Sequence, residues 1–240
     1  MISTAEFMHI AKNNDVSFAG VANLVPAFKE IELQGGRRLS GFPRAVSIGV
    51  SLPNPIVDGI ADQNDRISQK NYRHHGYDVI NARLDQITSR LASLIQDGGF
   101  SAYPIAASQV IDRENHLGTF SHKLAARLAG LGWIGKSCLL ITPTNGPRVR
   151  WASILTDSPF EPTGIPMEDR CGTCTKCVDI CPPQAFTGRA FHENEPRPAR
   201  FDAGKCAVYQ NQLREMVGVS LCGLCLQICP FGTSNKARST

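Results

Sequence analysis

Apolar side chains in the first 160 residues follow helical spacing in some stretches and strand-like runs in others. The strongest helical pattern covers residues 77–99, where apolar positions recur every three or four residues and Gly98 follows the last of them. This stripe consists of Ile80, Leu84, Ile87, Leu91, Leu94 and Ile95. Residues 121–130 predict a shorter helix, and Ser3 with Glu6 predicts a capping box at the start of another.

Short stretches rich in Val, Ile and aromatic residues predict β-strands between these helices. They are residues 16–24, 44–52, 100–108, 138–142 and 151–156. Because helices and strands alternate, we expect an α/β or α+β domain. A proline-rich stretch at 157–170 predicts a linker, so this first domain is expected to cover residues 1–165 and a second domain residues 166–240.

Composition places the chain among ordinary globular proteins, since 42% of its 240 residues are hydrophobic and 19% are charged. The N-terminus lacks the basic and apolar regions of a signal peptide, and no apolar stretch is long enough to span a bilayer. We therefore expect a cytoplasmic protein with no membrane partner. The formal charge of +4 comes without a long run of Lys and Arg, so it indicates an ordinary solvated surface more than a nucleic-acid site.

Eight of the nine cysteines come after residue 170, which points to metal rather than to disulfides in a reducing compartment. The first run is Cys171-x2-Cys174-x2-Cys177-x3-Cys181-Pro182, the spacing of bacterial ferredoxins. Three cysteines at this spacing wrap one iron–sulfur cubane, and the fourth ligates a second cluster.

The second run, Cys222-x2-Cys225-x3-Cys229-Pro230, lacks a leading cysteine, and Cys206 can replace it. We therefore predict two 4Fe–4S clusters, one on Cys171, Cys174, Cys177 and Cys229, and the other on Cys181, Cys206, Cys222 and Cys225. Zinc is the alternative, although zinc ribbons use two separated CxxC pairs and need no trailing Cys-Pro. Cys138 lies in an apolar run and is expected to be a buried small hydrophobe.

The segment GLGWIGKS, residues 130–137, matches the phosphate-binding P-loop pattern. A P-loop follows a strand and precedes a helix, whereas here a predicted helix comes first and a predicted strand follows. We therefore interpret the glycines as a helix end and a tight turn. Lys136 is either a contact for an anionic cofactor group or a solvated lysine. Among the histidines we single out His122, which precedes this turn, and expect the others to be surface or structural residues.

Four segments, LAARLAGLGWIGKSCLLITP, SILTDSPF, CGTCTKCVDICPPQA and CGLCLQICP, resemble the epoxyqueuosine reductase family, a relative of the reductive dehalogenases. The resemblance covers about residues 40–235. It implies a nitroreductase-like α/β domain followed by a ferredoxin-like domain with two 4Fe–4S clusters. It also implies cobalamin in the first domain, reduced through the clusters, and a substrate that is an epoxide of a modified tRNA base or an organohalide. The cofactor-binding candidates are His122, Gly132, Trp133 and Lys136.

Three departures from the family pattern change what we expect. The family's catalytic aspartate aligns near Ile105, where this sequence has no carboxylate, so the candidate proton donors are Tyr103, His122 and Asp112. The family's tRNA-handling extension after the second cluster is absent from this sequence, and the segment before residues 44–52 is short. We therefore expect a short relative that need not act on tRNA and whose cobalamin binding is weakened or lost.

Three functions follow from these observations. The first is an iron–sulfur reductase that passes electrons through two clusters to a cobalamin-type cofactor or a substrate. The second is an electron-transfer or activating protein that delivers low-potential electrons to a partner such as a corrinoid protein. The third is a flavin-dependent reductase, with Lys136 meeting the phosphate of FMN. In each case we expect an electron donor of the ferredoxin or flavodoxin type.

Overall fold

The computed structural model describes residues 2–193 and 195–233. The chain divides into two compact units, each assembled from separate stretches of sequence. The first unit consists of Met1–Ser51, Ile80–Gly132 and Arg150–Met167, and the second of Leu52–Val79, Trp133–Val149 and Glu168–Thr240. Residues 52–79 and 133–149 thus group with the cysteine-rich region, so the units do not follow a single boundary near residue 165.

A four-stranded sheet forms the centre of the first unit, in the order β1-β2-β6-β3. Its strands are β1 (Phe18–Asn23), β2 (Arg44–Ser51), β6 (Val149–Thr156) and β3 (Ala102–Ile105). β1 and β2 are antiparallel, with Val21 opposite Val46, and β3 and β6 are antiparallel, with Tyr103 opposite Leu155. All four strands lie within or beside the stretches whose Val- and Ile-rich patterns predict them.

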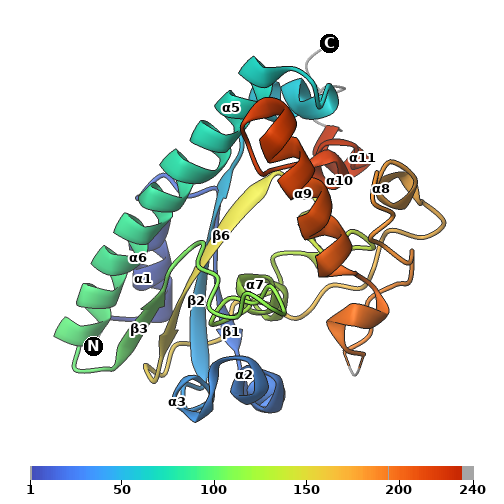
Figure 1. Ribbon diagram of the computed structural model, residues 1–240. Coiled ribbons are helices and arrows are strands. Elements are labelled where there is room, and N and C mark those ends of the chain that lie inside the picture. Colours follow the sequence, from blue (N-terminus) through green and yellow to red (C-terminus); the bar gives the residue numbers. More distant parts are fainter. Residues whose placement is uncertain (1, 194, 234–240) are drawn as a thin grey trace. The chain divides into compact units, whose positions relative to one another are not determined.

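Helices cover both faces of this sheet, with α6 (Ile80–Asp97) on one face and α7 (His122–Leu128) on the other (Figure 1). Because both faces are covered, the side chains of β2 are buried at successive positions from Ala45 to Val50 rather than at every second one. The predicted stripe of α6 is buried except at Leu94, which is 38% exposed.

The core on the α7 side joins the sheet to α2 (Phe28–Gly35) and α3 (Arg37–Ser40), which follow a short 3₁₀ turn at Val25–Ala27. Its buried side chains include Ala22, Leu24, Ile31, Leu39, Ala45, Ile105, Phe120, Ala125 and Leu155. At the N-terminus, α1 (Thr4–Lys12) begins with the predicted capping box. The Ser3 hydroxyl accepts from the Glu6 N–H, and the Ser3 N–H donates to the Glu6 carboxylate.

The second unit contains the hairpin β4–β5 and several short helices. β4 is Trp133–Ile134 and β5 is Leu140–Ile141, shorter than the strand predicted over 138–142. The helices before the hairpin are α4 (Asn54–Asp58), a 3₁₀ turn (Gly59–Ala61), α5 (Arg66–Arg73) and a π-helical stretch (His74–Val79). Those after it are α8 (Lys176–Asp179), a 3₁₀ turn (Arg197–Ala199), α9 (Ala203–Val217), α10 (Leu224–Gln227) and α11 (Pro230–Thr233).

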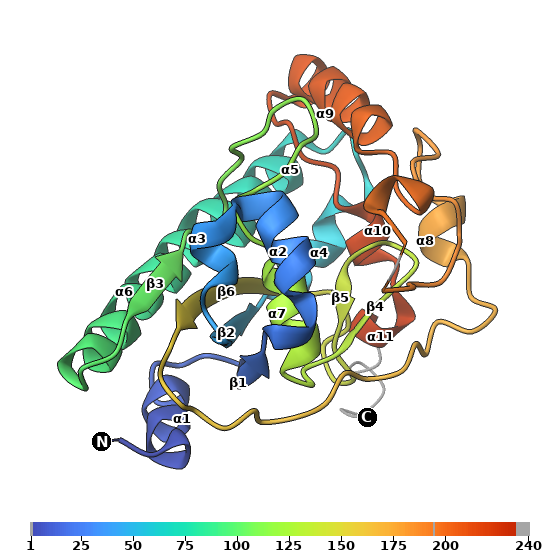
Figure 2. The ribbon, with the colours of Figure 1, turned by 90° about the horizontal axis from the view of Figure 1, so that it is seen from below.

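The hairpin lies beside α11 within the second unit (Figure 2). The rings of Trp133 and Phe231 meet edge to face with centroids 4.8 Å apart, and Gly146 lies directly against the backbone of Gly232. The residues between the hairpin and β6 therefore pack on the C-terminal cysteine run. Within residues 2–193 and 195–233, no helix is long and apolar enough to cross a membrane.

Candidate metal centre and polar cluster

The eight clustered cysteines all belong to the second unit, and each keeps a partly accessible side chain. Cys171 and Cys174 lie in the turn before α8, Cys177 lies on α8, and Cys181 follows it. On the C-terminal side, Cys206 lies on α9, Cys222 precedes α10, Cys225 is within α10, and Cys229 precedes α11. Cys138 is buried, as its apolar surroundings predict.

The first group of thiols combines three cysteines of the first run with one of the second. Burial and, after it, negative charge on Cys171, Cys229 and Cys174 together raise the pKa of Cys177 to about 11. Burial also raises the pKa of Cys229, with additional effects of Cys171 and Cys174. These effects involve the same four thiols that the sequence assigns to the first cluster.

The second group consists of Cys181, Cys206, Cys222 and Cys225. Burial and, after it, negative charge on Cys206 and Cys181 together raise the pKa of Cys222 to about 11. The pKa of Cys225 is raised by burial and then by Cys222 and Cys206, with smaller effects of Cys177 and Cys181. The two groups are therefore adjacent, and each contains cysteines from far apart in the sequence.

Both groups offer the donor set that a 4Fe–4S cluster needs, because each supplies four thiols from short loops and helix ends. N–H groups already point at sulfur: Ala185 N lies 3.4 Å from Cys181 Sγ, and Gln210 Nε2 lies 3.3 Å from Cys206 Sγ. Burial disfavours the thiolates, and the positive charge of bound iron offsets that cost. In the described part of the chain, no three His, Cys, Asp or Glu side chains form a site for a single metal ion. A cubane instead binds each thiolate through a different iron atom.

The turn at residues 130–137 serves the first cysteine run. It has a helix before it and a strand after it, which is the predicted order and the reverse of a P-loop. Lys136 Nζ donates to the carbonyl oxygens of Gly172 at 2.8 Å and Cys174 at 3.2 Å. Lys136 therefore binds the backbone of the first cysteine loop, whereas the sequence suggested either a contact with an anionic cofactor group or a solvated lysine. Trp133 is buried, with the Arg170 guanidinium 5.7 Å from its ring centroid, and the buried Gly132 precedes it.

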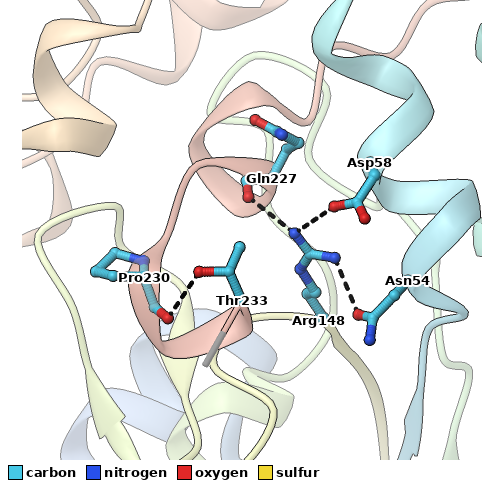
Figure 3. Close-up of polar contacts among 6 residues, drawn as sticks. All are labelled: Asn54, Asp58, Arg148, Gln227, Pro230 and Thr233. Atoms are coloured by element: carbon cyan, nitrogen blue, oxygen red, sulfur yellow. Dashed lines mark hydrogen bonds and ion pairs between the residues drawn. The ribbon is translucent and has the colours of Figure 1, made fainter. Parts of the chain in front are cut away.

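A buried arginine serves the second cysteine run (Figure 3). Arg148 Nη1 donates to Asn54 Oδ1 at 2.9 Å, and Nη2 donates to Asp58 Oδ1 at 2.9 Å and to the Gln227 carbonyl at 3.1 Å. Gln227 lies between Cys225 and Cys229, so Arg148 connects α4 to the loop that carries these ligand candidates. Sequence reasoning missed this residue because no motif surrounds it.

His122 belongs to a polar cluster in the first unit. Its Nε2 lies 3.0 Å from the Ala106 carbonyl, which can only accept, so Nε2 carries the proton. Its Nδ1 therefore accepts from the Ser153 hydroxyl at 3.0 Å. Burial lowers the pKa of His122 to about 4; the Ala106 hydrogen bond opposes this shift, Arg150 adds to it, and Asp85 opposes it. The imidazole is thus neutral at pH 7.

The other two proton-donor candidates have different surroundings. The ring of Tyr103 lies 6.1 Å from that of Phe42, with the guanidinium of Arg38 5.6 Å from its centroid. Asp112 accepts from the backbone N–H and side-chain amide of Asn115, and these hydrogen bonds lower its pKa. Asp112 is therefore an ionised turn residue at neutral pH.

Sequence reasoning also missed Asp85, whose carboxylate lies beside the end of β3. Its Oδ1 accepts from the Ala107 N–H at 2.8 Å, two residues beyond Ile105. No local sequence pattern connects these positions, because Asp85 lies on α6, twenty residues before Ile105 in the chain. This exposed carboxylate therefore lies beside the end of β3.

Comparison with known proteins identifies the class of the second unit. A model of the 4Fe-4S double cluster binding domain matches residues 170–232, a range that contains all eight clustered cysteines. The chain is thus an iron–sulfur protein with a double-cluster domain. An epoxyqueuosine reductase of Bacillus subtilis is 31% identical over 172 residues, which are 68% of this chain and 38% of that relative. One of Bacillus anthracis is 27% identical over 206 residues, 80% of this chain and 49% of the relative.

These matches confirm the resemblance seen in the sequence: the chain is an epoxyqueuosine reductase-like iron–sulfur protein. It spans half or less of the length of these two relatives.

Solved structures show the same fold. An epoxyqueuosine reductase with an epoxyqueuosine-modified tRNA stem loop aligns with a TM-score of 0.62 and 21% identity, over 95% of this chain and 65% of that one. A catabolic reductive dehalogenase in complex with 3-bromo-4-hydroxybenzoic acid aligns with a TM-score of 0.68 and 21% identity, over 95% of this chain and 31% of that one. At this identity the likeness concerns the fold, which is mixed α/β as predicted.

Proposed function

We propose that the chain is an iron–sulfur reductase that passes electrons through two 4Fe–4S clusters to a cobalamin-type cofactor or a substrate in its N-terminal domain, which we take to be nitroreductase-like. The observation that carries this proposal is the match of the double-cluster domain to residues 170–232, which contain all eight clustered cysteines. We assign one cluster to Cys171, Cys174, Cys177 and Cys229, and the other to Cys181, Cys206, Cys222 and Cys225, and the pKa shifts within these groups agree with the assignment.

The residues of the second unit would hold and insulate the clusters. When bound, such clusters exchange single electrons at potentials set by hydrogen bonds, charge and exposure. The thiolates anchor the iron, and Lys136 and Arg148 fix the two loops that carry them. A ferredoxin- or flavodoxin-type donor would deliver electrons to one cluster, and the other would pass them on to the cofactor or substrate.

The proposal of a corrinoid rests on the neighbours, one of which is a reductive dehalogenase structure described as suggesting a mechanism for B12-dependent dehalogenation. A corrinoid would supply a strongly reducing cobalt centre. His122 would not hold the cobalt, because both of its ring nitrogens are engaged by Ala106 and Ser153. We assign His122 instead to a structural role in this polar cluster, and we propose a small electrophile such as an epoxide or organohalide, rather than tRNA, as the substrate.

Among the three proton-donor candidates, Tyr103 fits this proposal best. The N–H of His122 is already donated to Ala106, and Asp112 is ionised and bound to Asn115. The phenol of Tyr103 retains an O–H that can be donated to a substrate.

The second candidate function is an electron-transfer or activating protein that serves a corrinoid partner. Two observations favour it: Ile105 occupies the place of the family aspartate, and His122 is locked in a neutral form. An FMN-dependent reductase has less support, because the two carbonyl contacts of Lys136 compete with a phosphate.

The decisive experiment is a metal count on anaerobically purified protein. Iron and sulfide are reconstituted, hydroxocobalamin is added, and the protein peak from a sizing column is analysed. We expect about eight irons, two 4Fe–4S clusters, with one cobalt for the reductase. Eight irons without cobalt favour the electron-transfer protein. Four irons or fewer, or stoichiometric zinc in the native preparation, would contradict the assignment of the cysteines.

A further inference from the structure

The glycine-rich turn at residues 130–137 holds the first cysteine loop through Lys136, and its pattern is the most distinctive outside the cysteines. Its effect on the redox chemistry of a cluster is not part of the function proposed so far. We propose that Lys136 is a positioning residue for the cluster on Cys171, Cys174, Cys177 and Cys229: it closes the first cysteine loop and raises the reduction potential of that cluster alone. This inference rests on the proposed function, since it requires that the two groups of cysteines hold clusters.

The hydrogen bonds of the Lys136 side chain are the first observation. Its ammonium group has three donors and no acceptor, and two of the donors reach the carbonyls of Gly172 and Cys174, at 2.8 and 3.2 Å. These carbonyls lie 36 and 38 residues along the chain from Lys136. Gly172 adopts φ +51°, a left-handed conformation that glycine tolerates and that directs its carbonyl to the lysine. The shape of the loop from Cys171 to Cys174 therefore depends on this one cation.

The backbone of the same turn is in contact with a ligand sulfur. A Cβ atom added at Gly135 would lie 3.3 Å from Cys171 Sγ and 2.8 Å from Ile141 Cγ1. The turn therefore places its backbone against the sulfur as well as a cation on the loop. Glycine at 135 is what allows this close approach.

Electrostatics then predicts the direction of the effect. Adding an electron makes a cluster more negative, so a nearby positive charge stabilises the reduced form and raises the potential. Lys176 directly precedes Cys177, but its side chain is exposed, whereas Lys136 is only partly exposed. Solvent therefore screens the charge of Lys136 less than that of Lys176. Asp169 opposes the effect, because its carboxylate accepts from the Cys171 N–H at 2.9 Å. Arg170 lies over the ring of Trp133 and adds positive charge nearby.

The same evidence argues against phosphate binding by the turn. A phosphate would have to displace the two carbonyls from Lys136, and the turn opens no helix whose N-terminal N–H groups face it. Binding of ATP or inorganic phosphate that is lost in the Lys136→Gln variant would overturn the proposal in favour of a P-loop-like role.

The test compares three variants of the reconstituted full chain. Lys136→Gln removes the charge and keeps a donor, Lys136→Arg keeps the charge, and Lys176→Gln removes an equal charge from the exposed position in the same run. Iron content is measured for each variant, and each is titrated with dithionite under EPR to obtain the reduction potentials of both clusters.

For Lys136→Gln we expect one of the two potentials to become more negative while the other stays unchanged. The expected shift is on the order of tenfold in the reduction equilibrium, which for one electron is about 59 mV. If the loop opens instead, about four irons are lost from one cluster, and this outcome also supports the positioning role. Lys136→Arg should keep the iron content and the potential of the wild type, and Lys176→Gln should change neither.

The inference is overturned if Lys136→Gln retains all its iron with both potentials unchanged, or if it shifts both clusters equally. It is also overturned if Lys176→Gln has the same effect. Failure of the proposed function is distinct, because wild-type protein would then bind four irons or fewer before any variant is made.

Discussion

At the scale of single residues, His122 shows how the first unit fixes a titratable group. The Ala106 carbonyl determines which ring nitrogen carries the proton, and the Ser153 hydroxyl occupies the other. Arg150 adds positive charge on one side and Asp85 negative charge on the other, and burial outweighs both in setting the pKa. The side chain is therefore a neutral structural link between α7, β6 and the end of β3.

This environment predicts a pH dependence of stability. The pKa of His122 is about 4 in the folded protein and 6.5 without the fold. Between these values the unfolded chain binds a proton that the folded chain does not, so stability falls as pH decreases from about 6.5 to about 4. At about 1.4 kcal/mol for each pKa unit, the loss should approach about 3.5 kcal/mol over the whole range and about 2 kcal/mol between pH 7 and pH 5. Urea unfolding of wild type and His122→Asn at pH 7 and pH 5 measures it, and an identical pH response of the two proteins would contradict it.

Gly146 illustrates a second effect at the scale of residues: both its left-handed backbone conformation and the lack of room for a side chain require glycine. It adopts φ +55°, and an added Cβ would overlap Gly232 N and lie 2.6 Å from Phe231 C. We expect Gly146→Ala to lower the free energy of unfolding by about 2–4 kcal/mol, the left-handed penalty plus overpacking.

Gly218 is the matched control, because it has φ +79° and no atom within 4 Å of an added Cβ. Gly218→Ala should cost only the conformational part, about 1 kcal/mol. Urea unfolding followed by circular dichroism compares the two variants. Equal losses would mean that Gly146 is required for its φ angle alone.

At the scale of elements, the segment Trp133–Val149 organises the second unit. Lys136 near its start contacts the first cysteine run, and Arg148 near its end contacts the second. Between them, the β4–β5 hairpin places Trp133 against Phe231. One short segment thus reaches both loops that carry the ligand candidates.

Arg148 provides the prediction for this scale. Its side chain is 1% exposed and that of Asp58 is 28% exposed, so their ion pair is largely shielded from water. Arg148→Met should lower the free energy of unfolding by about 2–4 kcal/mol, because Asp58, Asn54 and the Gln227 carbonyl lose their hydrogen bonds to the guanidinium. The same variant should release iron faster to a chelator, since the second cysteine run loses its anchor.

Arg37 is the control for Arg148, because it also pairs with a carboxylate, that of Glu32, but its side chain is 92% exposed. Arg37→Met should change the free energy of unfolding by less than about 1 kcal/mol. A similar loss for both variants in urea unfolding would show that burial of Arg148 contributes nothing.

The elements also show what the sequence could predict. Strands β1, β2, β3 and β6 and helix α6 carry strong apolar patterns, because a buried face repeats at the period of the element. Helix α5 was missed because it carries few buried side chains, Gln69 and Tyr72, and its apolar Ile67 is 75% exposed. The cysteine spacing predicted the ligand candidates, whereas Lys136, Arg148 and Asp85 act through contacts that no local motif encodes.

At the scale of the whole molecule, the two cysteine runs depend on each other. In the proposed assignment, each group of four thiols takes members from both the first run and the residues after 200, and the pKa shifts of Cys177, Cys222 and Cys229 agree with it. The second unit is therefore closed by contacts of long sequence separation, and the runs are expected to acquire their clusters together rather than one after the other.

Paired cysteine variants test this exchange of ligands between the runs. If Cys177 and Cys229 bind the same cluster, Cys177→Ser and Cys229→Ser should each lose one cluster, and the double variant should lose no more. In contrast, Cys177→Ser combined with Cys225→Ser should lose both clusters, because the two effects are then independent. Iron content and the EPR signal after dithionite reduction should show about four irons in the first double variant and almost none in the second. Cys138→Ser should keep about eight irons, since Cys138 is buried outside both groups. If the Cys177 and Cys229 double variant instead loses all its iron, the two runs do not share ligands, and each binds its cluster with its own cysteines.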